Sequence, residues 1–332
     1  MAKKEIIEQK NVFGVERINP DKPTIIINSN THGNLGKTTE EIRFISFYEA
    51  VMGFRPVIIS ADPTDPKVMR ERYGQRNSNN ILLPERQQQL GVGVVEVDLE
   101  EKDGTLADYI SQATEMGRDA VIDFKGGNLN AFADTWGGLV PFFNNFSNCH
   151  FIWQVPFLEA DKDIENLGLQ YDLLTSDDIY ADIDIVHIFS YGKLGGKNKA
   201  EHHMELIAQW DEANQYPSNI KTHKAVFTTA WANVPELINT FRFKDLRAEA
   251  NKASRDNARM LAENFLKEGD KFWAKTVLSQ EQREALAFRP HPVTTQPGRL
   301  WGKTLFNREE IQDIADSKQD PLEKDMWLGL LK

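Results

Sequence analysis

The chain has 332 residues, of which 40% are hydrophobic and 27% are charged, and its formal net charge is −11 at pH 7. Such a composition is typical of a globular protein with a substantial core, built as one large domain or as a domain with an appendage. The negative charge argues against a protein that coats nucleic acid by bulk attraction, although a local basic patch or a protein partner could supply a DNA contact.

Cysteine usage and the distribution of apolar residues bear on the compartment. The one cysteine, Cys149, excludes an internal disulfide and a cysteine metal cluster, and we expect it to be a small buried apolar residue. The opening residues MAKKEIIEQK hold no apolar stretch typical of a secretory signal, and no uncharged apolar run reaches the roughly 18 residues of a membrane span. We therefore expect a soluble, cytoplasmic protein.

Short runs rich in Val, Ile and Phe predict seven strands that are covered on both faces. These runs are residues 24–28, 56–60, 91–97, 119–124, 149–155, 184–189 and 224–229. Segments of helical period lie between them: Phe44, Phe47, Tyr48 and Val51 mark one face of a helix after the first run, and further helices are expected at 105–117, 160–175 and 198–214. The alternation predicts an α/β fold with a doubly wound, mostly parallel sheet of about seven strands.

The alternation of strands and helices stops near Pro235, and residues 235–288 have a helical pattern. We therefore divide the chain into a core at 1–240 and a helical C-terminal extension at 241–332 that packs on or near that core. The tail PLEKDMWLGLLK is short and carries few cations, which favours docking on the chain's own core or on a partner over membrane binding. Trp301 and Trp327 are expected to be packing residues rather than platforms for bases.

The stretch TIIINSNTHGNLGKTTEEIRF, residues 24–44, joins a predicted strand to a predicted helix through a glycine-containing turn. Glycines such as Gly33 and Gly36 let successive backbone N–H groups converge on phosphate oxygens, and the helix N-terminus adds partial positive charge. Lys37 would reach the β- and γ-phosphates, and the Thr38 hydroxyl would ligate Mg²⁺. The pattern G-x-x-x-x-G-K-[ST] is not met in full, because its first position falls on Thr31. The alternative is a plain turn with a solvated lysine.

Two acidic residues close neighbouring strand candidates, where the ligand crevice of an open α/β sheet lies. Asp62 follows the second strand and could orient a water or help to hold Mg²⁺, but Asp-Pro is also common turn chemistry. Asp123 ends the run RDAVIDF as the acidic residue of a Walker B strand does, and it could hold Mg²⁺ directly or through water. Gly126 completes a D-x-x-G pattern in which a glycine N–H meets the γ-phosphate. The alternative for Asp123 is an ordinary strand-ending carboxylate.

Together these segments resemble the ParA/MinD family of deviant Walker A P-loop ATPases, over roughly residues 22 to 240. The family's K-G-G-x-G-K-[ST]-[ST] loop is matched by His32, Gly33, Asn34, Leu35, Gly36, Lys37, Thr38 and Thr39. Its D-x-D-P segment is matched by Ser60-Ala61-Asp62-Pro63, and its Walker B segment D-x-x-x-I-D by Asp119 to Asp123. The chain is a divergent relative, since His32 stands where the family has its signature lysine.

The resemblance implies a slow, Mg²⁺-dependent ATPase that forms a homodimer on binding ATP. In that family scheme Lys37 contacts the phosphates, Thr38 the Mg²⁺, Asp62 the attacking water and Asp123 the outer shell of the metal. The base is expected near Asn233 and Pro235, and the absence of an N-K-x-D motif favours ATP over GTP. Because histidine is shorter than lysine and mostly neutral near pH 7, His32 is not expected to supply the same cross-dimer charge.

The leading functional prediction is an ATPase that switches its assembly state to position DNA or to partition plasmids, with a protein partner that serves as a DNA-binding adaptor. Two alternatives stay open. One is a nucleotide-sensing module of a conjugation or secretion apparatus with weak hydrolysis. The other is a metabolic P-loop enzyme of the dethiobiotin-synthetase type, which shares the fold.

Overall fold

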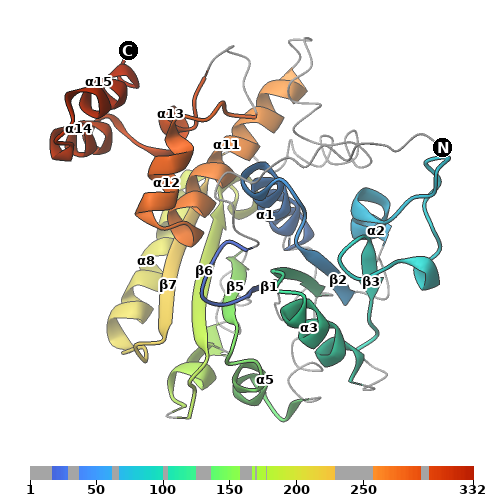
Figure 1. The fold of residues 1–332 in the computed structure, drawn as a ribbon. Coiled ribbons are helices and arrows are strands. Elements are labelled where there is room, and N and C mark those ends of the chain that lie inside the picture. Colours follow the sequence, from blue (N-terminus) through green and yellow to red (C-terminus); the bar gives the residue numbers. More distant parts are fainter. Residues whose placement is uncertain are drawn as a thin grey trace.

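The computed structural model describes residues 17–28, 37–61, 67–99, 104–124, 136–157, 167–168, 170–176, 178–228, 257–292 and 299–332. These residues form an α/β fold in which seven strands build one sheet (Figure 1). The strands are β1 (Thr24–Asn28), β2 (Val57–Ala61), β3 (Val94–Glu96), β4 (Ala120–Phe124), β5 (His150–Phe157), β6 (Asp182–Ser190) and β7 (Ile220–Phe227). All seven predicted strands are present, although several differ from the prediction by a few residues at their ends.

The strand order across the sheet is β3-β2-β4-β1-β5-β6-β7, and every neighbouring pair is parallel. The chain therefore winds first toward β3 and then, from β4 onward, away from it. Right-handed crossovers place the helices of these two windings on opposite faces of a sheet. The predicted doubly wound fold is thus confirmed, with a sheet that is parallel throughout.

Two hydrophobic clusters cover the two faces of the sheet. On one face, side chains of α1 (Lys37–Met52) and α2 (Lys67–Tyr73) pack with Ile26, Val121 and Ile152. On the other face lie α3 (Thr105–Glu115), α5 (Leu139–Asn145) and α8 (Lys197–Ala213). Short helical turns lie at Glu85–Gln87 (η1) and Tyr191–Leu194 (α7). Cys149 is fully buried among apolar side chains, as predicted.

Helices that follow β7 in the sequence return to the α1 face. They are α11 (Asn257–Val277), α12 (Gln280–Ala287), α13 (Gly302–Leu305), α14 (Arg308–Ser317) and α15 (Pro321–Gly329). Figure 1 shows α11 beside α1, and the rings of Trp273 and Phe44 meet edge to face with centroids 4.9 Å apart. Trp301 and Trp327 are buried in the same cluster, so both are packing residues as predicted. The predicted boundary near residue 240 lies outside the described residues, and the division into core and extension stays a prediction.

Burial of α1 is more complete than its sequence pattern indicates. Phe44, Phe47, Tyr48 and Val51 are buried as expected, but Glu40, Glu41 and Arg43 are buried as well. For Arg43 the reason is α11, whose Phe265 ring lies against the guanidinium group, whereas Glu41 lies near Asp123 of β4. Among the described residues, no helix is long and apolar enough to span a membrane.

Candidate functional site

A row of four polar residues crosses four neighbouring strands, near the carboxyl ends of β1, β2 and β4 and midway along β5. Ser60 of β2 is in register with Asp123 of β4, Asp123 with Asn28 of β1, and Asn28 with Gln154 of β5. All four are almost fully buried, although each stands in an otherwise apolar run. The row lies on the sheet face that carries α1. Each of its residues comes two positions after an apolar residue of that face, and residues two apart in a strand point to the same side. These apolar residues are Ile26, Ile58, Val121 and Ile152. A polar row at this edge is where an open α/β sheet binds ligands.

The first turn of α1 is held directly against this row. The side-chain amide of Asn28 donates to the backbone carbonyl of Lys37 over 2.7 Å and to Gln154 Oε1 over 3.3 Å. This pair of hydrogen bonds ties the beginning of α1 to β1 and β5. The partial positive charge of the N-terminal end of α1 therefore faces the crevice beyond the strands, as anion binding requires.

Two residues predicted to serve the metal lie together. The Thr38 hydroxyl donates to the Asp123 carboxylate, at 3.3 Å from Oδ1 and 3.5 Å from Oδ2. Thr38 comes from α1 and Asp123 from β4, so their proximity depends on how the helix crosses the sheet. A hydroxyl and a carboxylate are hard oxygen donors of the kind that Mg²⁺ takes.

Glu41 adds a second carboxyl group at the same place. It follows Thr38 by three residues, so it shares a helical face with Thr38, and its side chain is fully buried. Burial and the adjacent Asp123 carboxylate raise the pKa of Glu41 well above its usual range, while Lys37 acts to lower it. Neither carboxyl oxygen of Glu41 accepts a hydrogen bond from a described donor. We call Thr38, Glu41 and Asp123 the Asp123 cluster.

Lys37 is buried at 6% exposure, close enough to Glu41 for its charge to act on that carboxyl group. A solvated lysine in a plain turn, the alternative left open by the sequence, does not have this environment. Thr39, another predicted phosphate-binding residue, is also buried on the first turn of α1.

The remaining predicted site residues lie outside the described part of the chain. They are His32, Gly33, Asn34, Leu35 and Gly36 of the loop, Asp62 after β2, Gly126 after β4, and Asn233 and Pro235 after β7. Their roles stay predictions. In the described ranges, no group of three or more His, Cys, Asp and Glu side chains could hold a metal ion. A cation at the Asp123 cluster would therefore need further oxygen ligands, such as the Thr38 hydroxyl, phosphate and water.

The amino end of β4 carries a contrasting carboxylate. Asp119 accepts hydrogen bonds from the backbone N–H of Ile18 at 2.9 Å, the backbone N–H of Thr24 at 2.7 Å and the Tyr48 hydroxyl at 3.0 Å. Burial raises the pKa of Asp119, and these three donors oppose that rise. We call Asp119, Ile18, Thr24 and Tyr48 the Asp119 cluster. Because three donors from other segments already bind this carboxylate, we assign it a structural role.

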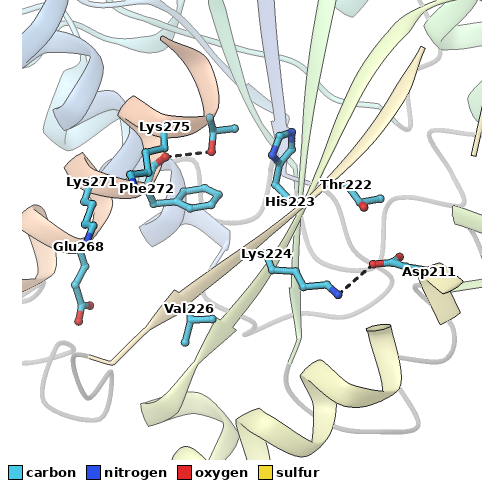
Figure 2. Close-up of a pocket in the computed structure, with 10 residues that line it drawn as sticks. Asp211, Thr222, His223, Lys224, Val226, Glu268, Lys271, Phe272 and Lys275 are labelled. Carbon is cyan, nitrogen blue, oxygen red and sulfur yellow. Dashed lines mark hydrogen bonds and ion pairs between the residues drawn. The ribbon is translucent and has the colours of Figure 1, made fainter. Parts of the chain in front are cut away.

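A cavity of about 760 Å³ lies elsewhere, beside the edge strand β7 and α11 (Figure 2). Figure 2 shows Lys224 pointing toward Asp211 of α8, and the two form an ion pair at 3.3 Å. Lys275 at its rim pairs with Glu310. The lining includes none of the predicted site residues, and these charged groups already neutralise one another, so the polar row remains the candidate site.

Comparisons with known proteins do not assign a function to this chain. No protein-family model matches the chain, and no curated protein matches it. Among solved structures, the chain is similar to a plasmid partition protein from Borrelia burgdorferi B31 bound to AMPPNP. The match has a TM-score of 0.40 and 12% identity, and it covers 74% of this chain and 98% of that one. Values this low assign no function to this chain.

Sequence reasoning missed Asn28, Gln154 and Glu41 as members of the site. The first two were read only as parts of apolar strands, yet a buried amide in a run such as CHFIWQV is itself a signal. Glu41 follows Lys37 by four residues, so helical spacing alone places both on one face. Which way that face points was decided by the packing of α1 on the sheet.

Proposed function

We propose that this chain is an Mg²⁺-dependent ATP-binding protein of the ParA-like type that hydrolyses ATP slowly. The observation that carries the proposal is the meeting of Thr38 and Asp123 beside the buried Lys37. All three lie where the N-terminal end of α1 faces the carboxyl ends of β1 and β4. Lysine, hydroxyl and carboxylate are the groups that phosphoryl-transfer sites use around Mg²⁺ and a triphosphate.

The residues present fit the absent cofactors. Mg²⁺, when bound, would neutralise charge on the β- and γ-phosphates. The Thr38 hydroxyl would be a direct ligand, Asp123 would accept hydrogen bonds from the water ligands of the metal, and Lys37 would contact the phosphates. The buried Glu41 oxygens, without a described donor, are an independent sign that this place is built for a cation.

The finer roles belong to the same proposal. Asp62 orients the attacking water, His32 stands at the loop position that faces a second subunit, and ATP binding brings two copies of the chain together. A nucleotide-dependent dimer of this kind could partition plasmids or position DNA through a protein adaptor, since the net charge of −11 does not favour direct coating of DNA.

A binding measurement with fluorescent ATP, with and without Mg²⁺, tests the proposal. We expect Lys37→Ala to weaken binding by about 100-fold, because a charge-assisted contact to phosphate is lost from a partly desolvated site. Lys197→Ala, at the exposed start of α8, is the matched control and should bind as the unaltered chain does. Equal affinity in Lys37→Ala and the unaltered chain would end the proposal.

The assembly state is measured separately by light scattering without nucleotide, with ADP and with ATP, alongside phosphate release. Dimers that form only with ATP, together with measurable turnover, would support the partition-type switch. Binding without turnover would favour the nucleotide-sensing alternative.

A further inference from the structure

Glu40 and Glu41 are adjacent carboxylates on α1 with opposite surroundings. Glu40 is paired with Arg43 at 2.9 Å, and both side chains are buried. Glu41 is equally buried, and neither of its carboxyl oxygens accepts a hydrogen bond from the described part of the chain. A buried carboxyl group costs several kcal/mol unless it is neutralised or paired. Among the described residues Glu41 has no such ion pair, in contrast to Glu40.

The position of Glu41 limits what could satisfy it. Glu41 lies on the side of α1 that carries Lys37 and Thr38 and faces β4, and the nearby Asp123 repels it when both groups are ionised. Two carboxylates beside one hydroxyl attract a small divalent cation, and Mg²⁺ keeps several waters that need hydrogen-bond acceptors. The four oxygens of Glu41 and Asp123 would provide those acceptors.

We propose that Glu41 is a second metal-positioning carboxylate of this chain, which acts with Asp123 to hold the water shell of the Mg²⁺ that accompanies ATP. The inference rests on the proposed function, because it places the metal at Thr38. It goes beyond that function by assigning a role to a residue outside the loop and strand motifs. Glu41 touches the metal shell rather than the reacting phosphate, so it is a positioning residue.

The test measures metal affinity and nucleotide affinity independently. Free Mn²⁺, a spectroscopic substitute for Mg²⁺, is counted by electron paramagnetic resonance in the presence of a non-hydrolysable ATP analogue. Binding of the same analogue in EDTA measures the nucleotide affinity of the site without the metal. We expect Glu41→Gln to weaken Mn²⁺ binding at least tenfold while binding of the analogue in EDTA is unchanged or stronger, since a negative charge near the phosphates is gone.

Two further variants separate a local role from a general loss of charge. Glu49→Gln removes the same charge from α1 at a surface ion pair with Arg55 and should bind Mn²⁺ normally. Glu41→Asp keeps the carboxylate on a shorter stem and should recover part of the Mn²⁺ affinity that Glu41→Gln loses. Thermal unfolding without metal adds a readout of folding: Glu41→Gln should unfold at a higher temperature, because a neutral amide costs less to bury than a carboxyl group without an ion pair.

The possible failures are distinguishable. Normal Mn²⁺ affinity in Glu41→Gln, with analogue binding intact, would overturn the role of Glu41 and leave the proposed function standing. Equal loss in Glu49→Gln would also overturn it, because the effect would then be bulk electrostatics. If the unaltered chain binds no analogue in EDTA or with Mn²⁺, the proposed function itself fails.

Discussion

Asp119 and Asp123 stand at the two ends of strand β4, and both are buried. At the amino end, the Asp119 cluster supplies three donors, two from the backbone and one from Tyr48. At the carboxyl end, the Thr38 hydroxyl donates to Asp123 over 3.3 Å or more, and the neighbouring Glu41 is a second acid. The first arrangement stabilises the fold. The second places two acidic groups together in one buried place, as the proposed cation site requires.

Helix α1 also carries a buried charged group that has its partners, and this group connects the site to the C-terminal helices. The guanidinium carbon of Arg43 lies 3.6 Å from the ring centroid of Phe227 and 3.7 Å from that of Phe265 on α11. A Cβ atom at Gly269 of α11 would lie 2.4 Å from Arg43 Cγ, so the helix needs a glycine where this side chain passes. Glu40, Arg43 and the two rings therefore join the helix that begins at the site to the helix that covers it.

The largest expected effect comes from removing the Arg43 charge. Arg43→Met should lower the free energy of unfolding by about 4 kcal/mol, because Glu40 is left buried without its partner and two cation–π contacts are lost. Urea denaturation measures the change, and Glu40→Gln combined with Arg43→Met should restore part of it. A loss below about 1 kcal/mol would mean that the pair is only an incidental contact.

The second prediction compares the two ends of β4 directly. Asp119→Asn should lower the free energy of unfolding by about 3 kcal/mol. The amide NH2 group of asparagine cannot accept a hydrogen bond, so at least one of the three buried donors loses its acceptor. Asp123→Asn should change the free energy of unfolding by less than about 1 kcal/mol or raise it, since a repulsion with Glu41 is removed. Both values come from urea denaturation at neutral pH without nucleotide. Similar losses at the two positions would erase the distinction between a structural and a functional carboxylate.

The smallest expected effect concerns a buried group that the fold holds neutral. His187 of β6 is fully buried, with Nε2 2.6 Å from Gln170 Oε1. Burial lowers its pKa to about 4 from an ordinary 6.5; Asp211 opposes the shift, and Lys224 and His223 add to it. As the pH falls, the unfolded chain takes up the proton first, so stability is present above about pH 6.5 and is lost toward pH 4.

For this histidine, the loss from pH 6.5 to about pH 5 should be near 2 kcal/mol, at 1.36 kcal/mol per pKa unit. His187→Gln keeps an amide donor for Gln170, and its unfolding free energy should vary less over that interval. Parallel pH profiles in urea give the difference between the two proteins. Identical slopes would show that His187 is not held neutral by burial.

Much of the fold was predictable because parallel strands that are buried on both faces leave nearly continuous apolar runs. Runs such as TIIIN and DAVIDF gave the strands, and the helical segments between them gave the α/β class. The ends of β3 and β7 were less predictable, since strand ends depend on pairing with neighbours rather than on composition. The near-complete burial of α1 was not predictable at all, because it requires α11, which lies more than two hundred residues later in the chain.

The candidate site divides in the same way. Lys37, Thr38 and Asp123 were identified from a glycine-lysine turn and a strand-ending carboxylate, which are local patterns. Glu41 was overlooked because nothing in the local sequence distinguishes it from its neighbour Glu40, which pairs with Arg43. Glu40 meets Arg43 three residues later on the same helix, whereas only the crossing of α1 over the sheet brings Glu41 near Asp123.

The sequence by itself determined which segments are strands and helices, and which residue types stand at the strand ends, since these follow from short-range periodicity and backbone preference. The tertiary structure alone decided which buried charges are satisfied. The reason is electrostatic: a carboxylate taken out of water is stabilised or left in conflict by the few groups within a few ångströms. For Asp119 and Asp123 those groups come from distant segments that only folding brings together.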